Sequence, residues 1–399
     1  MKQEDVALEL GVSRSTVAQM ELGNRPVTSL ELDRLAYLYG RDIREFLADE
    51  FRDRDAFAAL FRGQVDRDEP MREVLRRCMS LGREMTNLER LIGVGRGWTP
   101  AATYPVADPQ RKWDAIEQGE EAAEAERRRL GLGSAPVSDF AEVLEAQGVR
   151  TLLVALPENV SGLTLMEPSV GVIVVANGDH HVHRQRFSYA HEYAHVLFDR
   201  ARLGLISRTE DRDDLIEVRA NSFAAGLLMP KGGVEEIVAS FGKGSPSRLR
   251  AAVLDGGGIA VPVEARSEPG TQDMQLYDVL HLAHHFWVSP IAALYRLKNL
   301  RLVTEEELQR LKAGLDEKRI DPLWKILFGS ELKSETVRDD FRHRFLGLAL
   351  EAYRREAITR AKLDQLAAMF EVSGKHVDVL LEGTGLGRRA KGDVLLPGR

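Results

Sequence analysis

One stretch limits the fold of this 399-residue chain more than any other: residues 191–195 read His-Glu-Tyr-Ala-His. Apolar residues recur around it at the three- and four-residue spacing of one helix face, at Phe187, Ala190, Ala194 and Phe198. Residues i and i+4 share a helix face, so both imidazoles can bind one ion. Glu192 is placed to hold the water that this ion acidifies. Imidazole and carboxylate ligands suit Zn2+.

A third ligand comes from a second predicted helix, residues 215–229, which Pro230 ends. Its Glu217 and Asn221 are again four residues apart and share one face. We expect Glu217 to bind the ion and Asn221 to form a hydrogen bond with one of the ligands, on the side of that ligand that faces away from the ion. Three protein donors leave a position open for water, as in catalytic zinc sites. The alternative is a buried helix whose histidines are satisfied by hydrogen bonds.

Residues 186–195 and 217–230 resemble the ImmA/IrrE family of bacterial zinc metallopeptidases. The resemblance implies that His191, His195 and Glu217 bind zinc and that Glu192 is the general base. It also implies a cytoplasmic endopeptidase that cleaves a partner protein at a specific site. The implied substrate is a helix-turn-helix repressor, whose loss derepresses stress-response or mobile-element genes. A competing hypothesis is a DNA-binding transcriptional regulator whose zincin domain is a sensor or a docking platform.

Composition limits the class of protein. The net charge of −7 argues against a protein that coats nucleic acid by charge alone, so DNA binding should be local. The single cysteine, Cys78, excludes an intramolecular disulfide and fits a reducing cytosol, and we interpret it as a helix-packing residue. The apolar runs are far shorter than a membrane span, so we expect no membrane association.

Residues 3–49 carry a second pattern. A short helix ends at Gly11, and Ser13 caps a following helix over residues 14–21. Two helices joined by a short turn with glycine form a helix-turn-helix. The segment resembles the Cro/repressor-type (XRE) family, although the first helix of that family has no counterpart before Gln3. Mapping the recognition helix onto this sequence gives six candidate DNA contacts: Gln3, Ser13, Arg14, Ser15, Thr16 and Gln19.

The charge of this segment leaves an alternative open. Residues 1–50 contain six Lys or Arg against ten Asp or Glu, whereas phosphate contact favours the opposite balance. The segment could therefore bind a protein partner or form a homodimer instead of binding DNA. A further helix is expected over residues 43–47.

The predicted fold class is multidomain and mainly α, with an α+β zincin-like metallopeptidase core. We predict five regions: a helix-turn-helix (1–50), a helical connector (51–135), the metallopeptidase (136–240), a loop or insertion (241–275) and a helical C-terminal domain (276–399). Strands are expected over residues 149–156, 162–166 and 170–176. A polar, acidic loop over residues 203–214 should border the cleft.

The last third repeats an earlier pattern. Residues 279–289 and 363–373 share the helix–Val-Ser–helix order of residues 6–13, and both could be further helix-turn-helix units. Packing against the peptidase is the favoured interpretation, although residues 294–300 could form a second DNA-facing helix. Two histidine clusters are weaker metal candidates. We interpret His180, His181 and His183 as a polar loop, one member of which could stabilise an oxyanion, and no third donor accompanies His281, His284 and His285.

Overall fold

The chain is described by a computed structural model. It covers residues 3–39, 46–47, 69–94, 102–167, 170–200, 202, 204–244, 249–254, 260–265, 268, 270–329 and 340–386. The helix expected over residues 43–47 lies largely outside the described residues. Among the described residues, no helix combines the length and apolar character needed to cross a membrane.

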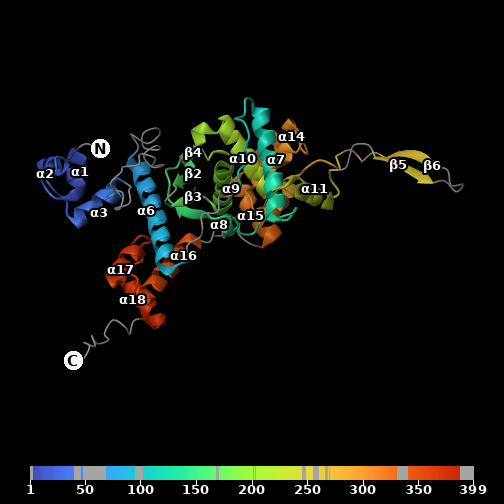
Figure 1. The fold of residues 1–399 in the computed structure, drawn as a ribbon. Coiled ribbons are helices and arrows are strands. Elements are labelled where there is room, and N and C mark those ends of the chain that lie inside the picture. The colour runs from blue at the N-terminus through green and yellow to red at the C-terminus, as the bar shows by residue number, and fades with distance from the viewer. Residues whose placement is uncertain are drawn as a thin grey trace.

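A four-stranded mixed sheet is the centre of the fold (Figure 1). Its strands are β1 (Val149–Val154), β2 (Val160–Glu167), β3 (Gly171–Asn177) and β4 (Gly204–Arg208), in the order β1-β3-β2-β4. β1 runs parallel to β3, and β2 runs antiparallel to both β3 and β4. The β-branched runs thus form the strands that the sequence predicted.

Both faces of the sheet are buried, and alternate residues of each strand serve different cores. Val172, Val174 and Ala176 of β3 face one hydrophobic cluster, and Ile173 and Val175 face another. The first cluster involves α7 (Lys112–Leu130), α8 (Phe140–Ala146), α9 (Val182–Phe198) and α10 (Leu215–Leu228). The second involves α6 (Glu69–Ile92), α16 (Asp340–Arg354), α17 (Arg360–Ala368) and α18 (Gly374–Gly383).

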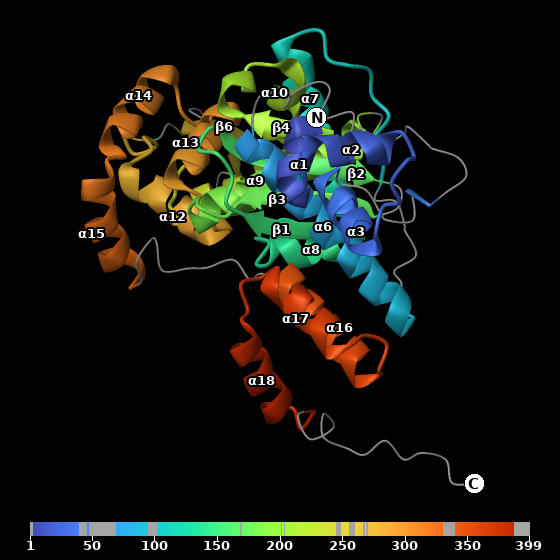
Figure 2. The same cartoon turned by 90° about the vertical axis from the view of Figure 1, so that its left-hand side faces the viewer.

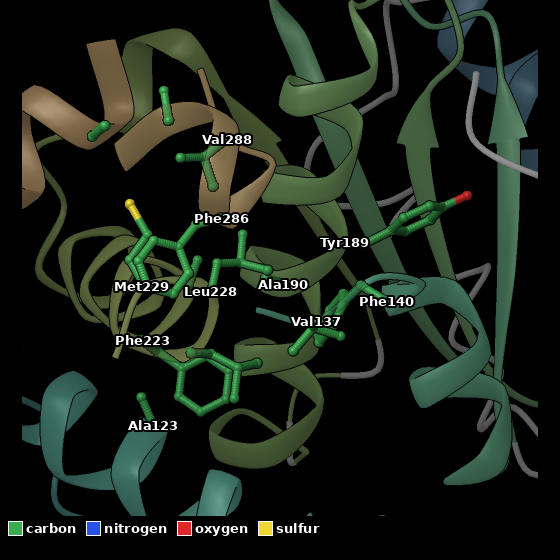
Figure 3. Close-up of a cluster of buried hydrophobic side chains, with 14 of the residues drawn as sticks. Ala123, Val137, Phe140, Tyr189, Ala190, Phe223, Leu228, Met229, Phe286 and Val288 are labelled. Carbon is green, nitrogen blue, oxygen red and sulfur yellow. The ribbon is translucent and has the colours of Figure 1, made fainter. Parts of the chain in front are cut away.

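Four further helices extend the first cluster: α11 (Lys231–Ser240), α12 (Leu276–Phe286), α13 (Pro290–Asn299) and α14 (Glu305–Gly314). Trp324 of α15 (Glu317–Phe328) also belongs to it. Figure 3 shows Phe286 of α12 beside Leu228 and Met229 from the end of α10. The helices of residues 276–328 therefore pack against the peptidase core, as the favoured interpretation predicted.

The contacts of Arg296 show that α13 packs against the peptidase core. Its side chain is buried, pairs with Glu120 of α7 and donates to the carbonyl of Met229 (2.8 Å). A buried arginine with these partners cannot contact phosphate. The alternative of a DNA-facing helix over residues 294–300 is therefore wrong for Arg296.

The N-terminal helices α1 (Gln3–Leu10), α2 (Arg14–Glu21) and α3 (Ser29–Leu38) enclose a separate small core. Gly11 adopts a positive φ of 67° between α1 and α2, and the Ser13 hydroxyl accepts from the backbone N–H of Thr16. These are the predicted turn and the predicted cap. In Figure 2 the N-terminal helices lie in front of α6.

Two local expectations were wrong. Residues 203–214 were predicted as a loop but contain β4 and a short 3-10 helix, Thr209–Asp211, because residues 204–208 pair with β2. Residues 241–275 were predicted as a loop or insertion, and within them β5 (Leu249–Leu254) and β6 (Ala260–Ala265) pair as an antiparallel hairpin. The hairpin projects from the body in Figure 1.

The second wrong expectation concerns the region before α9. His181 caps α9 and His183 lies inside it, buried, so only His180 belongs to the loop that was predicted for all three histidines. The interpretation of Cys78 is confirmed. Its thiol is fully buried in α6, which raises its pKa to about 12.

Candidate metal centre

The two motif histidines lie on the buried side of α9, one turn apart. Their Nε2 atoms are 3.2 Å from each other, and both rings are almost without solvent exposure. The helix is buried along most of its length because α10 and the sheet cover it. Helical spacing therefore brings both rings to one point, as the sequence predicted.

Glu217 on α10 completes the group. Its Oε2 atom is 2.9 Å from Nε2 of His191, and its Oε1 atom is 3.4 Å from Nε2 of His195. Within the described part of the chain, His191, His195 and Glu217 form the one group of three ligand-type side chains that could hold a metal ion. Donors held tetrahedrally at about 2.1 Å from zinc are themselves about 3.4 Å apart, so the spacing observed here is close to what zinc needs.

Polar groups behind the rings fix their orientation. Nδ1 of His191 is 3.0 Å from Oδ1 of Asn221, which accepts its proton. Nδ1 of His195 is 2.8 Å from Oδ2 of Asp199, whose other oxygen accepts from Arg219 at 2.8 Å. A proton on each Nδ1 leaves each Nε2 lone pair directed at the centre. The donor set therefore fits a bound cation.

The electrostatics of the group agree with this fit. Burial alone would lower the pKa of His195, but the hydrogen bonds with Asp199 and Glu217 raise it to about 10. Burial would raise the pKa of Glu217, but its bonds to the two imidazoles hold it well below its usual range. Two carboxylates thus support positive charge at the rings, and a divalent cation supplies such charge without protonation of a ligand.

Glu192 lies on the neighbouring side of α9, against the sheet. Its Oε2 atom accepts from the Thr164 hydroxyl on β2 at 2.7 Å. Its Oε1 atom is buried without a hydrogen-bond partner, which is costly for a carboxylate. Burial raises the pKa of this carboxyl, and the nearby imidazoles of His195 and His191 oppose that shift. An ion held by those rings favours the charged carboxylate that a general base requires.

The sheet makes room for this carboxylate at Gly162. A Cβ atom at that position would lie 2.7 Å from Oε1 of Glu192 and 2.8 Å from the carbonyl of Val175. β4 lies at an edge of the sheet, next to β2. In the described sheet β4 pairs with β2 only, so no described strand occupies its outer edge.

The structure locates all six candidate DNA contacts on or beside α2. Ser13, Arg14, Ser15 and Gln19 are exposed, and Gln3 and Thr16 are half-buried. Gln3 donates to Glu21 at 2.6 Å, and Arg14 pairs with Glu4 at 3.1 Å. These contacts hold two of the six side chains against neighbouring carboxylates.

Three residues of the site escaped the sequence interpretation: Asp199, Arg219 and Thr164. Asp199 had a signal, because it follows His195 by four residues on the same helix face. Arg219 had a weaker one, because it lies between Glu217 and Asn221. Thr164 had none, since only strand pairing brings β2 beneath α9.

The comparisons with known proteins agree with this geometry. Residues 144–247 match the model of the IrrE N-terminal-like domain, a peptidase family. Residues 1–46 match a helix-turn-helix model. No curated protein matches the chain. The chain thus combines an N-terminal helix-turn-helix domain of the XRE type with a metallopeptidase-like domain of the ImmA/IrrE family.

Proposed function

We propose that this protein is a zinc-dependent endopeptidase that cleaves a partner protein at a specific site. The observation that carries the proposal is the convergence of His191, His195 and Glu217, with a hydrogen-bond partner behind each imidazole. The adjacent Glu192 has an unpartnered buried oxygen. A purely structural site would have no use for that carboxylate, because its burial costs free energy.

Zinc held by the three side chains would supply a Lewis acid that acidifies water and polarises a peptide carbonyl. Glu192 would accept the proton of the attacking water and pass it to the leaving amine. Thr164 orients that carboxylate through its hydroxyl. Asn221 and Asp199 keep the imidazoles in one tautomer. The outer edge of β4 would align the substrate backbone beside the site.

For the substrate we propose a helix-turn-helix repressor, whose cleavage would derepress stress-response or mobile-element genes. The family resemblance and the helix-turn-helix domain of the same chain support this class. For the N-terminal domain we propose local DNA binding through α2, with Gln3, Ser13, Arg14, Ser15, Thr16 and Gln19 as the contact set.

The test separates metal binding from catalysis. Purified wild type and Glu192→Gln should each bind one equivalent of zinc, measured by elemental analysis. In the host, after DNA damage, only the wild type should generate a new N-terminus inside a repressor, detected by N-terminal proteomics. Glutamine keeps the shape of the side chain but cannot accept the proton, so the cleavage rate should fall at least about 100-fold.

The opposite result is also informative. If Glu192→Gln yields the same N-termini as wild type while zinc is retained, the endopeptidase proposal fails. The zincin domain would then be the sensor or docking platform of a transcriptional regulator.

A further inference from the structure

The helix-turn-helix geometry of the N-terminal domain occurs twice more in the described chain. In each case a residue with positive φ follows a helix, directly after α1 and α12 and three residues after α17: Gly11 (67°), Trp287 (57°) and Glu371 (61°). A valine and a serine follow, and the serine precedes the next helix. Neither tryptophan nor glutamate favours this backbone region, so the surrounding packing imposes the turn.

The hydrogen bonds of the three turns are the same. The valine N–H donates to the carbonyl of an alanine five residues earlier: Val12 to Ala7 (3.0 Å), Val288 to Ala283 (3.0 Å) and Val372 to Ala367 (3.1 Å). Each alanine is buried, and so is the residue four positions after each serine: Val17, Ala293 and Val377. The α17–α18 pair therefore reproduces the turn and the core positions of the α1–α2 unit, which matches the helix-turn-helix model.

The second helices differ in their exposed positions. The places that Arg14, Ser15, Thr16 and Gln19 occupy in α2 correspond to Pro290, Ile291, Ala292 and Tyr295 in α13, and to Gly374, Lys375, His376 and Val379 in α18. The α13 set is apolar apart from the Tyr295 hydroxyl, to which Lys312 donates at 3.0 Å. All four residues of the α18 set are exposed.

The four exposed positions of the α18 set carry a lysine, a histidine and no carboxylate, whereas residues 359–386 as a whole contain three Lys or Arg and four Asp or Glu. Lys375 and His376 lie in the first turn, where backbone N–H groups add partial positive charge. The carboxylate of Asp378 is paired with Arg360 at 2.9 Å. In α13, by contrast, the arginine of the second helix, Arg296, is buried.

We propose that α17–α18 is a second DNA-binding helix-turn-helix, whose α18 enters the major groove of double-stranded DNA. Lys375 contacts phosphate or a base edge, and Val379 lies against a thymine methyl group. This inference is independent of the peptidase proposal, because α18 lies in the other core.

The test uses the full-length protein and a fluorescent DNA duplex of about 30 base pairs, first of random sequence and then enriched by selection. Binding is measured by anisotropy over a range of salt concentrations. Lys375→Gln should weaken binding severalfold and reduce the slope of log K against log salt by about 0.9. Arg14→Gln should weaken binding separately, and the double variant should bind more weakly than either single variant.

Two matched controls accompany these variants. Lys231→Gln removes another exposed lysine, from α11, and Tyr295→Ala changes the α13 position that corresponds to Val379. Both should bind like wild type, and circular dichroism should show that all variants remain folded.

Three outcomes would overturn the proposal. The first is an unchanged affinity and salt slope for Lys375→Gln, and the second is no DNA binding by the wild type. The third is an altered oligomeric state of α18 variants with unchanged DNA binding, which would make this helix a protein interface.

Discussion

At the scale of single residues, the site depends on groups that never touch the ion. Asp199 and Arg219 are both almost fully buried and pair with each other, and Asp199 also holds Nδ1 of His195. A buried carboxylate that lies between an imidazole and a guanidinium has a hydrogen-bond partner on each side. These partners offset the cost of burying its charge, so the carboxylate can stay ionised. This chain of contacts orients one of the three ligands.

We therefore expect Asp199→Asn to lower zinc affinity about 10- to 100-fold, because the ring loses the carboxylate that makes it a stronger donor. Competition with a chromophoric chelator measures the affinity directly. Asp213→Asn is the control, since Asp213 is an exposed carboxylate on the loop before α10. Equal zinc affinity for Asp199→Asn and wild type would show that Asp199 serves only packing.

At the scale of elements, α10 reaches its position by close contact with α7. Gly119 of α7 faces the backbone of α10, and a Cβ atom there would lie 2.5 Å from the carbonyl of Arg219 and 2.8 Å from the N–H nitrogen of Phe223. Since Glu217 and Asn221 belong to the same helix, the small residue in α7 sets the position of a ligand.

Gly119→Ala should lower the free energy of unfolding by about 1–3 kcal/mol, because the two helix backbones must separate. Gly347→Ala is the matched control in α16, where nothing lies within 4 Å of the added Cβ. There the helix should gain about 0.5–1 kcal/mol. Urea denaturation of both variants measures the change in the free energy of unfolding, which should be negative for Gly119→Ala and positive for Gly347→Ala. A stabilised Gly119→Ala would contradict the close approach of the two helices.

The contact between α9 and α12 should respond to pH. Burial lowers the pKa of His183 to about 4, with neighbouring positive groups acting in the same direction. A folded-state pKa below the unfolded value of about 6.5 makes the fold lose stability as pH falls from 6.5 towards 4.

Between pH 7 and pH 5 the wild type should therefore lose about 2 kcal/mol that His183→Gln does not lose. Urea denaturation at both pH values measures the difference, and comparing the two proteins cancels the titration of the metal ligands. Parallel pH dependence of the two proteins would place the protonation of His183 outside this range.

At the scale of the whole molecule, two hydrophobic clusters lie on opposite faces of one sheet, and distant parts of the chain share each of them. The clusters run across the predicted boundaries at residues 135 and 275, which themselves remain predictions. Val279, Leu280, Ala283 and Phe286 of α12 are completely buried in the cluster that supports the metal centre.

A chain that ends at residue 270 should therefore fail to fold cooperatively. Losing the burial of three large apolar side chains at about 1.5–3 kcal/mol each already approaches the total stability of a typical domain. Near-ultraviolet circular dichroism and zinc binding would report the loss. Removal of residues 1–46 is the control, because the helix-turn-helix has its own core. A truncated chain that binds zinc and unfolds cooperatively would refute this dependence.

Local patterns in the sequence determined the metal helix, the second ligand helix, the three predicted strands and the N-terminal turn. Helical spacing, β-branched runs, caps and glycines act over a few residues. They can therefore be recognised without knowing which distant part of the chain packs against them. The two histidine ligands were predictable for the same reason, since they are four residues apart in one motif, and Glu217 was predicted from the second helix and the family resemblance.

Only the tertiary structure decided which residues surround these locally predicted helices, strands and ligands. Residues 204–208 became a strand because β2 offered a free edge, and Thr164 reached Glu192 because strand pairing put β2 beneath α9. Three turns with one geometry lie in different surroundings, because α13 is packed against α7 and the four α18 positions remain exposed. Contacts between residues far apart in the chain depend on the whole packing arrangement, and no short pattern encodes them.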